Sequence, residues 1–149
     1  MIKKISLLAA LLVCTGCLWA TIPKTINFAG RTYYFSEVEE NGTAVFETAG
    51  TFVSSFSIVP TLVDSPKKEA EDLCKTNTET EGPHSDCQIH FCSSDDILVS
   101  IVYGTERHTY LQLIRITKQE TFIILTEQEY PLSKYRWALC QFPLDTLSK

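Results

Sequence analysis

The densest cluster of reactive side chains is HSDCQIHFC, which runs from His84 to Cys92. Histidine and cysteine are the residue types that most often bind zinc, so this composition suggests a metal site. The spacing argues against one, because structural zinc sites place their ligand pairs well apart along the chain. A strand would also turn Cys87 to one face of a sheet and His90 to the other. We therefore expect no metal ion here, and the sequence indicates no cofactor.

Disulfide bonds explain these cysteines better. The chain has six cysteines, and four remain outside the N-terminal leader described below: Cys74, Cys87, Cys92 and Cys140. An even set of cysteines in an exported chain is typical of a disulfide framework. A bond between Cys87 and Cys92 is disfavoured if these residues face opposite sides of a strand. Of the two pairings that remain, we expect Cys74 with Cys87, which would close the polar loop onto its helix, and Cys92 with Cys140, which would tie the last helix to the sheet.

Hydrolysis is the catalytic alternative, because a serine, a histidine and an acid can together supply a nucleophile, a base and an orienting group. His90 and His108 are the candidate bases, each with an acidic residue nearby in the sequence. The G-x-S-x-G turn that presents many nucleophilic serines does not occur. We therefore assign no catalytic residue, and a small envelope hydrolase that uses His90 or His108 is the alternative function. A histidine within about 3 Å of both a serine hydroxyl and a carboxylate in a cleft would favour it.

The N-terminal residues have the pattern of a bacterial export signal. Lys3 and Lys4 precede an apolar run that ends at Val13. Such a run is too short to cross a membrane, which takes about 20 helical residues. We therefore expect a cleavable leader.

Two cleavage sites compete in this leader. A cut after Ala20 defines residues 1–20 as the signal peptide and predicts a periplasmic or secreted protein. The sequence Thr15-Gly16-Cys17 resembles the end of the bacterial lipobox, which implies a cut after residue 16 and a lipid on Cys17. In that alternative the protein is anchored in the envelope, and the lipid is its expected contact with a membrane.

Residues 21–149 have the length of one ordinary domain, able to bury about two thirds of its unfolded surface. The formal net charge is -5 and the isoelectric point is about 5.2, and the basic residues are scattered along the chain. Both observations argue against a nucleic-acid partner, because phosphate binding needs clustered lysine and arginine. We expect a protein partner instead.

The first half of this domain predicts strands followed by a helix. Three strand candidates come first, and Asn41-Gly42 is expected to form the tight two-residue turn of a hairpin. A short helix is expected from Pro66 to about Lys75, with Ser65 as its cap.

The second half predicts a meander closed by a helix. Four consecutive strand candidates are CQIHFC, ILVSIVYG, TYLQLIRIT and TFIILTEQEY, and Ser133 is expected to cap a last helix that Pro143 ends. Together the elements predict an α+β domain, with an antiparallel sheet of about six to seven strands and one central and one C-terminal helix packed on it. In order of elements, most of residues 21–149 resembles the small exported α+β domains of the Mog1 and PsbP type. This resemblance implies a fold and no site, because it rests on no sequence motif.

The polar run KTNTETEGPHSD, from Lys75 to Asp86, has little apolar surface to bury and predicts a mobile loop. Cysteines stand directly before and after it, so both ends are expected to be held. The loop is either a tolerated surface insertion or a recognition site held by a rigid scaffold. In the second case Glu79, Glu81 and Asp86 contact a basic partner. Tyr34 is another candidate for partner binding, because tyrosine is enriched in binding hot spots.

These observations favour an exported, non-enzymatic binding or interaction protein of the bacterial envelope, of the inhibitor, immunity or assembly-accessory type. They are the export signal, the expected disulfides and the lack of a convincing catalytic constellation.

Trp137, which is near Cys140 in the last helix, is expected to pack around that disulfide.

Overall fold

The computed structural model describes residues 22–50, 54–60, 62–81, 86–104, 109–127 and 132–144. The predicted leader, with both cleavage sites and Cys17, lies outside the described residues, and so does His108. Within the described ranges, no helix is both long enough and apolar enough to cross a membrane.

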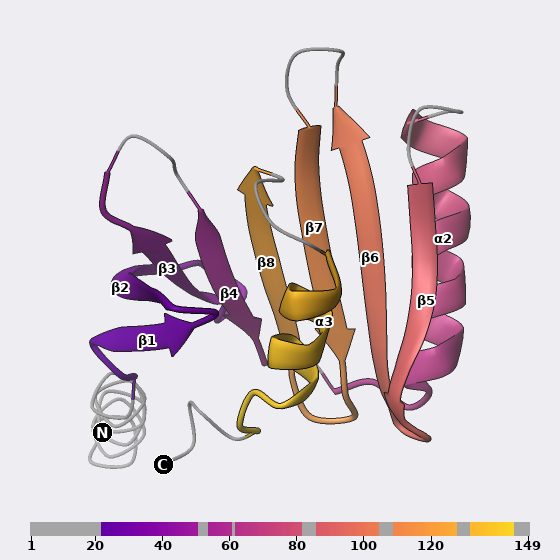
Figure 1. Cartoon of the computed structure of the whole chain (residues 1–149). Coiled ribbons are helices and arrows are strands. Elements are labelled where there is room, and N and C mark those ends of the chain that lie inside the picture. Colours follow the sequence, from indigo (N-terminus) through magenta and orange to yellow (C-terminus); the bar gives the residue numbers. More distant parts are fainter. Residues whose placement is uncertain are drawn as a thin grey trace, which may run out of the picture.

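One antiparallel sheet runs through the molecule (Figure 1). Its eight strands follow the spatial order β1-β2-β3-β4-β8-β7-β6-β5, so β1 and β5 are its edges. The strands are β1 (Thr25–Phe28), β2 (Arg31–Val38), β3 (Ala44–Thr48), β4 (Ser55–Val59), β5 (Asp86–Ser93), β6 (Asp96–Gly104), β7 (Thr109–Ile116) and β8 (Thr121–Glu127). The described helices are α2 (Pro66–Glu81) and α3 (Leu132–Cys140). The predicted α+β class with an antiparallel sheet is confirmed.

The strand count exceeds the prediction because residues 25–39, which the sequence predicts as one strand, form a hairpin of β1 and β2. β1 and β2 pair with Phe28 opposite Arg31, so the two residues between them form the turn. Ala29 and Gly30 have φ values of 49° and 80°, and two consecutive positive φ angles are typical of a type I′ turn. Alanine rarely adopts such a φ, so the sequence alone predicted one continuous strand.

The hairpin between β2 and β3 is confirmed, but its turn differs from the predicted one. The Glu39 N–H donates to the Thr43 carbonyl and the Gly42 N–H donates to the Glu39 carbonyl, both at 2.9 Å, so the loop has three residues. In this loop Gly42 has a φ of 85°, whereas Asn41 accepts a hydrogen bond from the Thr43 N–H through its side-chain oxygen at 2.9 Å. One left-handed glycine in a three-residue loop is a common hairpin connection.

The two helices cover opposite faces of the sheet (Figure 1). On one face, α2 packs against apolar side chains that alternate along β6: Ile97, Val99 and Ile101. On the other face, Tyr135 and Leu139 of α3 join a cluster that contains Leu98 of β6. The period of two along β6 therefore divides its apolar residues between the helices.

α2 is longer than the sequence predicted. The helix continues past Lys75 to Glu81, so the predicted mobile loop is wrong for residues 75–81. Most side chains from Lys75 to Glu79 are exposed. The solvent-facing surface of a helix is polar, so a polar run can continue a helix instead of forming a loop. The Thr78 hydroxyl also donates to the Cys74 carbonyl at 2.9 Å, across one helical turn.

The predicted caps of the two helices have different outcomes. Ser65 does cap α2, because its Oγ accepts a hydrogen bond from the Lys68 N–H at 3.4 Å, and Pro66 is the first helical residue. α3 begins at Leu132, so Ser133 lies inside its first turn instead of capping it.

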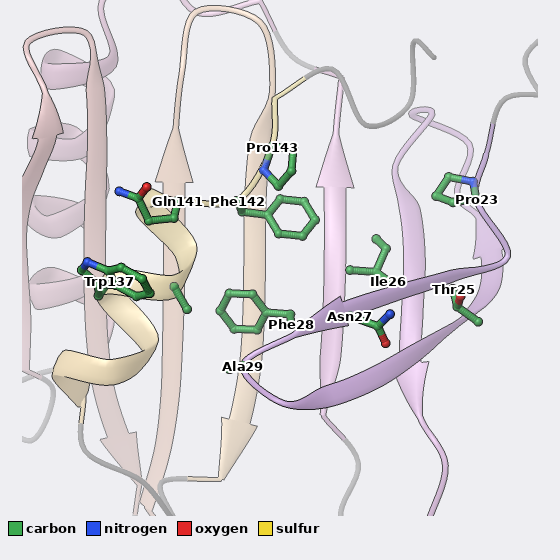
Figure 2. A pocket seen from close by; sticks show the side chains of 11 residues that line it. Pro23, Thr25, Ile26, Asn27, Phe28, Ala29, Trp137, Gln141, Phe142 and Pro143 are labelled. Carbon is green, nitrogen blue, oxygen red and sulfur yellow. The ribbon is translucent and has the colours of Figure 1, made fainter.

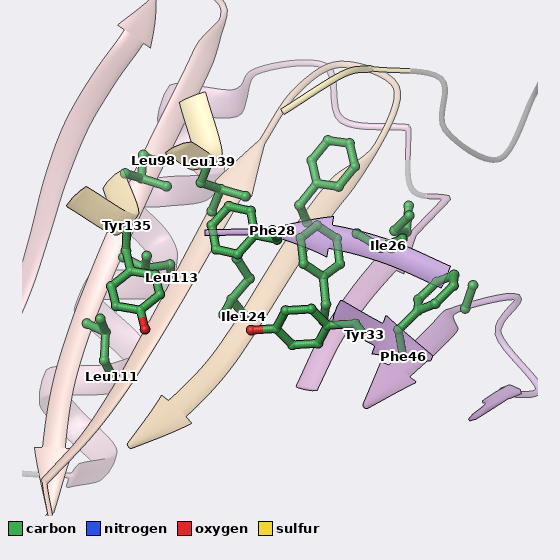
Figure 3. Packing of buried hydrophobic residues seen from close by; sticks show 14 residues of the cluster. Ile26, Phe28, Tyr33, Phe46, Leu98, Leu111, Leu113, Ile124, Tyr135 and Leu139 are labelled. Carbon is green, nitrogen blue, oxygen red and sulfur yellow. The ribbon is translucent and has the colours of Figure 1, made fainter. Parts of the chain in front are cut away.

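The larger hydrophobic core lies between the N-terminal strands, the middle of the sheet and α3 (Figure 3). The Phe28 ring of β1 is 5.5 Å from the Phe56 ring and 6.2 Å from the Tyr135 ring, centroid to centroid. The Phe56 and Phe142 centroids are 4.8 Å apart. This packing brings an edge strand next to the C-terminal helix, although their residues come from opposite ends of the chain.

Candidate functional site

An open groove lies between the edge strand β1 and the C-terminal helix with the residues that follow it (Figure 2). Its volume is about 500 Å³, which is within the range of ligand pockets. Much of its lining is apolar and includes Ile26, Phe28, Trp137, Ala138, Phe142 and Pro143. An open groove of this kind can admit a segment of a larger molecule.

β1 supplies one wall of the groove. Alternation along this strand buries Ile26 and Phe28, which are 4% and 3% exposed, and leaves Thr25 and Asn27 at the surface. The buried pair anchors β1 to the aromatic core, so the wall has a fixed position.

α3 supplies the opposite wall, and Trp137 is its exposed aromatic residue. Tyr135 and Leu139, two positions before and after it, are buried in the core, so the helical period turns Trp137 outward. Its side chain is 71% exposed, and the prediction that it packs around the Cys140 disulfide is wrong. Because tryptophan buries a large area on contact and is enriched in binding hot spots, this exposure marks a place where a partner can gain much energy.

Arg115 of β7 holds the C-terminal end of α3 against the sheet. Its side chain is 4% exposed, and its Nη1 donates to the carbonyl oxygens of Leu139 at 2.9 Å and Phe142 at 2.6 Å. Its Nε donates to Asp96 Oδ1 at 2.8 Å, and Nη2 pairs with the second carboxylate oxygen. A cation there satisfies carbonyls that a helix end leaves free and interacts favourably with the helix dipole. The groove wall is therefore preorganised.

Two disulfides tether the helices to the same edge strand. Cys74 of α2 is bonded to Cys87 of β5, and Cys92 of β5 is bonded to Cys140 of α3, with Cα–Cα distances of 5.6 Å and 5.4 Å. The predicted pairing is confirmed. Cys87 and Cys92 also face opposite sides of β5, as predicted. Cys87 packs with the apolar residues under α2, and Cys92 packs with those under α3.

His90 of β5 lies outside the groove lining and has the wrong partners for a general base. Its Nε2 is 3.0 Å from Ser100 Oγ, and Arg136 Nη1 is 2.9 Å from Nδ1 and 3.1 Å from Nε2. Arginine can only donate, so the ring nitrogen that Arg136 contacts must accept. A base that takes the Ser100 proton through Nε2 would need a carboxylate at Nδ1, whereas the Arg136 guanidinium lies 2.9 Å from that nitrogen.

The pKa of His90 and the burial of Ser100 also argue against His90 as a general base. Burial, and then the Arg136 guanidinium, lower the pKa of His90 from its ordinary value of 6.5, so the imidazolium formed during hydrolysis would be destabilised. Ser100 is 1% exposed, which leaves its hydroxyl inaccessible to a substrate. Among the described residues no carboxylate contacts this pair, and the other candidate base, His108, lies outside them.

The residues predicted to bind a partner do not line the groove. Glu79 is exposed near the end of α2, Asp86 is exposed at the start of β5, and only the backbone of Glu81 is described. Tyr34 is 51% exposed on β2, opposite Thr25, which lines the groove. Tyr34 therefore adjoins the groove, whereas Glu79 and Asp86 lie on elements that do not line it.

The two segments that build the groove have a distinctive charge pattern. Residues 22–31 and 132–144 contain no acidic side chain, although the chain has 18 acidic residues. Their charged residues are all basic: Lys24, Arg31, Lys134 and Arg136. None of the four is among the residues that line the groove, and Arg136 contacts His90 outside the lining. The sequence contains this charge pattern, but only the fold shows that the two segments are neighbours.

No protein-family model, curated protein or solved structure matches this chain. The resemblance in element order to domains of the Mog1 and PsbP type therefore stays a prediction. A functional assignment rests on the groove and on the residues around it.

Proposed function

We propose that this chain is an exported, non-enzymatic binding protein that holds a segment of a partner protein in the groove between β1 and α3. The observation that carries this proposal is the exposed Trp137 on the wall of an open apolar groove of about 500 Å³. A partner side chain would bury the indole together with the neighbouring lining of the groove, and such burial drives most protein association. In this role the protein would be an inhibitor, an immunity protein or an assembly accessory.

Three observations support the remaining parts of the proposal. The two disulfides support export, because such bonds persist in oxidising compartments. The surroundings of His90 support a non-enzymatic role, because Arg136 stands where a hydrolase would have a carboxylate. The anchoring of α3 by Arg115 supports tight binding, since a preformed groove loses less entropy when a partner enters.

Selection of displayed random peptides on the immobilised full chain tests the proposal. Peptides should be enriched on the wild type and on Leu62→Ala, which removes a control side chain that is 87% exposed and does not line the groove. The same peptides should bind Trp137→Ala about tenfold more weakly, which is typical of a hot spot. No enrichment on the wild type, or equal binding to all proteins, would contradict the proposal.

Tryptophan fluorescence gives a second measurement on the same site. The chain has two tryptophans, so Trp19→Phe leaves Trp137 as the sole indole. Binding of an enriched peptide should shift its emission to shorter wavelength, because the indole leaves water. An unchanged spectrum in a saturated complex would place the peptide elsewhere.

A further inference from the structure

We infer that Arg136 of α3, held in place by His90 of β5, is a binding site for a carboxylate. Arg136 does not line the groove, so this inference goes beyond the proposed function. Three features support it: the donors that Arg136 leaves unpaired, the neutral groups that hold its side chain, and the way in which another arginine of this chain uses the same donors.

The guanidinium of Arg136 has donors without a partner. Its Nη1 is 2.9 Å from Nδ1 of His90 and 3.1 Å from Nε2, and within the described parts of the chain these are its only polar contacts. Nε and Nη2 therefore carry N–H groups that make no hydrogen bond there. Every buried side-chain nitrogen and oxygen of the described residues has a partner, so Nε and Nη2 of this half-buried residue are open to solvent.

The groups that hold Arg136 in place are neutral. Nε2 of His90 is 3.0 Å from Ser100 Oγ on the adjacent strand β6, and this contact orients the ring. Burial, and then the guanidinium, lower the pKa of His90 from its ordinary value of 6.5, so the ring is uncharged at pH 7. His90 therefore positions the guanidinium and leaves its positive charge uncancelled, as a preorganised anion-binding group requires.

The acidic residues on this face of the sheet are engaged elsewhere. Side chains alternate along a strand, so Asp86 shares the face of His90 on β5, and Asp96 lies on the matching face of β6. Asp86 accepts a hydrogen bond from Gln88 Nε2 at 2.8 Å, and Asp96 is paired with Arg115. The sequence of α3 contains no acidic residue. The described residues therefore supply no carboxylate to this guanidinium.

Arg115 shows how this chain binds a carboxylate with one arginine. Its Nε and Nη2 donate to the two oxygens of Asp96, and its Nη1 donates to uncharged carbonyl oxygens. Arg136 has the same division, because Nη1 lies at an uncharged ring while Nε and Nη2 are the pair left open. This pair of donors matches the two oxygens of a carboxylate. One arginine also matches a single negative charge, whereas phosphate groups are typically recognised by arginine clusters.

A bound carboxylate would change the titration of His90. Its negative charge would offset that of the guanidinium, which is the second cause, after burial, that lowers the pKa of this ring. The pKa of His90 should therefore rise on binding, and the affinity should increase as pH falls through that pKa. The NMR signals of the imidazole thus report on the site in solution.

Sodium acetate is the first probe, and sodium chloride at the same ionic strength is the reference for screening. The ring signals of the three histidines are followed by NMR in the full chain, so His84 and His108 serve as internal references. The His90 signal is identified by its loss in His90→Gln. Acetate should shift this signal in a saturable manner and raise the pKa of His90. An equal response to chloride would overturn the inference.

Matched variants assign the binding to Arg136. Arg136→Gln should weaken acetate binding about tenfold, because it removes both the charge and the paired donors. Arg136→Lys keeps the charge but loses the pair, and it should weaken binding about fivefold. Lys68→Gln, on the exposed surface of α2, removes an equal charge and should bind acetate as the wild type does. Equal acetate affinity of Arg136→Gln and the wild type would contradict the assignment.

Two further ligands identify the source and the chemistry of the carboxylate. Acetyl-triglycine carries the carboxylate of a peptide C-terminus, whereas acetate represents a small free acid. Binding of either one that depends on Arg136 supports the inference, and the tighter of the two identifies the source. Inorganic phosphate should bind more weakly than both, because one arginine stands alone at this site. Tighter binding of phosphate would overturn the assignment to a carboxylate.

Discussion

The two faces of the sheet are covered to different extents. α2 has 16 residues and carries a polar outer surface, and the apolar residues of β6 beneath it are fully buried. α3 has nine residues, and beside it the apolar lining supplied by β1 and Phe142 opens into the groove. Both helices are tethered to β5 by a disulfide, so the tether does not explain the difference. A helix shorter than the surface it covers leaves room for a partner, and the contrast predicts that α3 matters for binding as well as for stability.

The largest expected effect comes from the removal of Arg115. Arg115→Leu should lower the free energy of unfolding by about 5 kcal/mol, because the partly buried Asp96 carboxylate and the carbonyls at the end of α3 lose their partner. Urea denaturation measures this loss. Lys118→Leu is the matched control, since Lys118 forms an exposed ion pair with Asp95 at 3.1 Å and should cost less than about 1 kcal/mol. Similar losses in the two variants would show that Arg115 does not anchor the groove wall.

The next largest effects compare the two tethers. Replacement of both cysteines by serine should cost about 4 kcal/mol for the bond between Cys92 and Cys140, and about 3 kcal/mol for the bond between Cys74 and Cys87, by the chain-entropy relation. The difference follows from sequence separations of 48 and 13 residues. Peptide affinity should fall for the first pair alone, because only that bond holds a wall of the groove. If loss of the α2 bond weakened binding as much, the two faces would be coupled.

Neighbouring residues on α3 separate stability from binding. Tyr135→Ala should lower the free energy of unfolding by about 3 kcal/mol, because the ring is 2% exposed in the core. Trp137→Ala should change it by less than about 0.5 kcal/mol, because the indole is largely in water. Thermal denaturation distinguishes them. A large destabilisation by Trp137→Ala would assign the indole to packing and remove the observation that supports binding.

The smallest expected effect concerns pH. The folded state lowers the pKa of His90 below its unfolded value of 6.5, so the folded protein takes up this proton less readily than the unfolded chain. The stabilisation from His90 is thus present above pH 6.5 and is lost as pH falls through 6.5 towards the folded pKa. Between pH 8 and pH 5, the urea midpoint should fall more for the wild type than for His90→Gln. Equal decreases would show that the ring titrates normally beside Arg136.

Local patterns made much of the fold predictable. Runs rich in isoleucine, valine, tyrosine and phenylalanine identified the four strands that follow α2, and the opposite faces of Cys87 and Cys92 excluded one of the three disulfide pairings. Other features depend on distant packing. The positive φ of Ala29 is unusual for alanine, and the polar end of α2 lies on the sheet without an apolar pattern of its own. The groove was missed because Phe28 and Trp137 come from opposite ends of the chain, and no periodicity within either segment shows that they meet.

The attachment of both helices to β5 has a consequence for oxidative folding. β5 is an edge strand with no fully buried side chain, and register is weakly specified where no face of a strand is buried. A slip by one residue would turn Cys87 towards α3 and Cys92 towards α2, so neither native bond would form. Closure of both bonds therefore requires the native register of β5. A misaligned chain keeps free thiols, which can still attack non-native disulfides and exchange them.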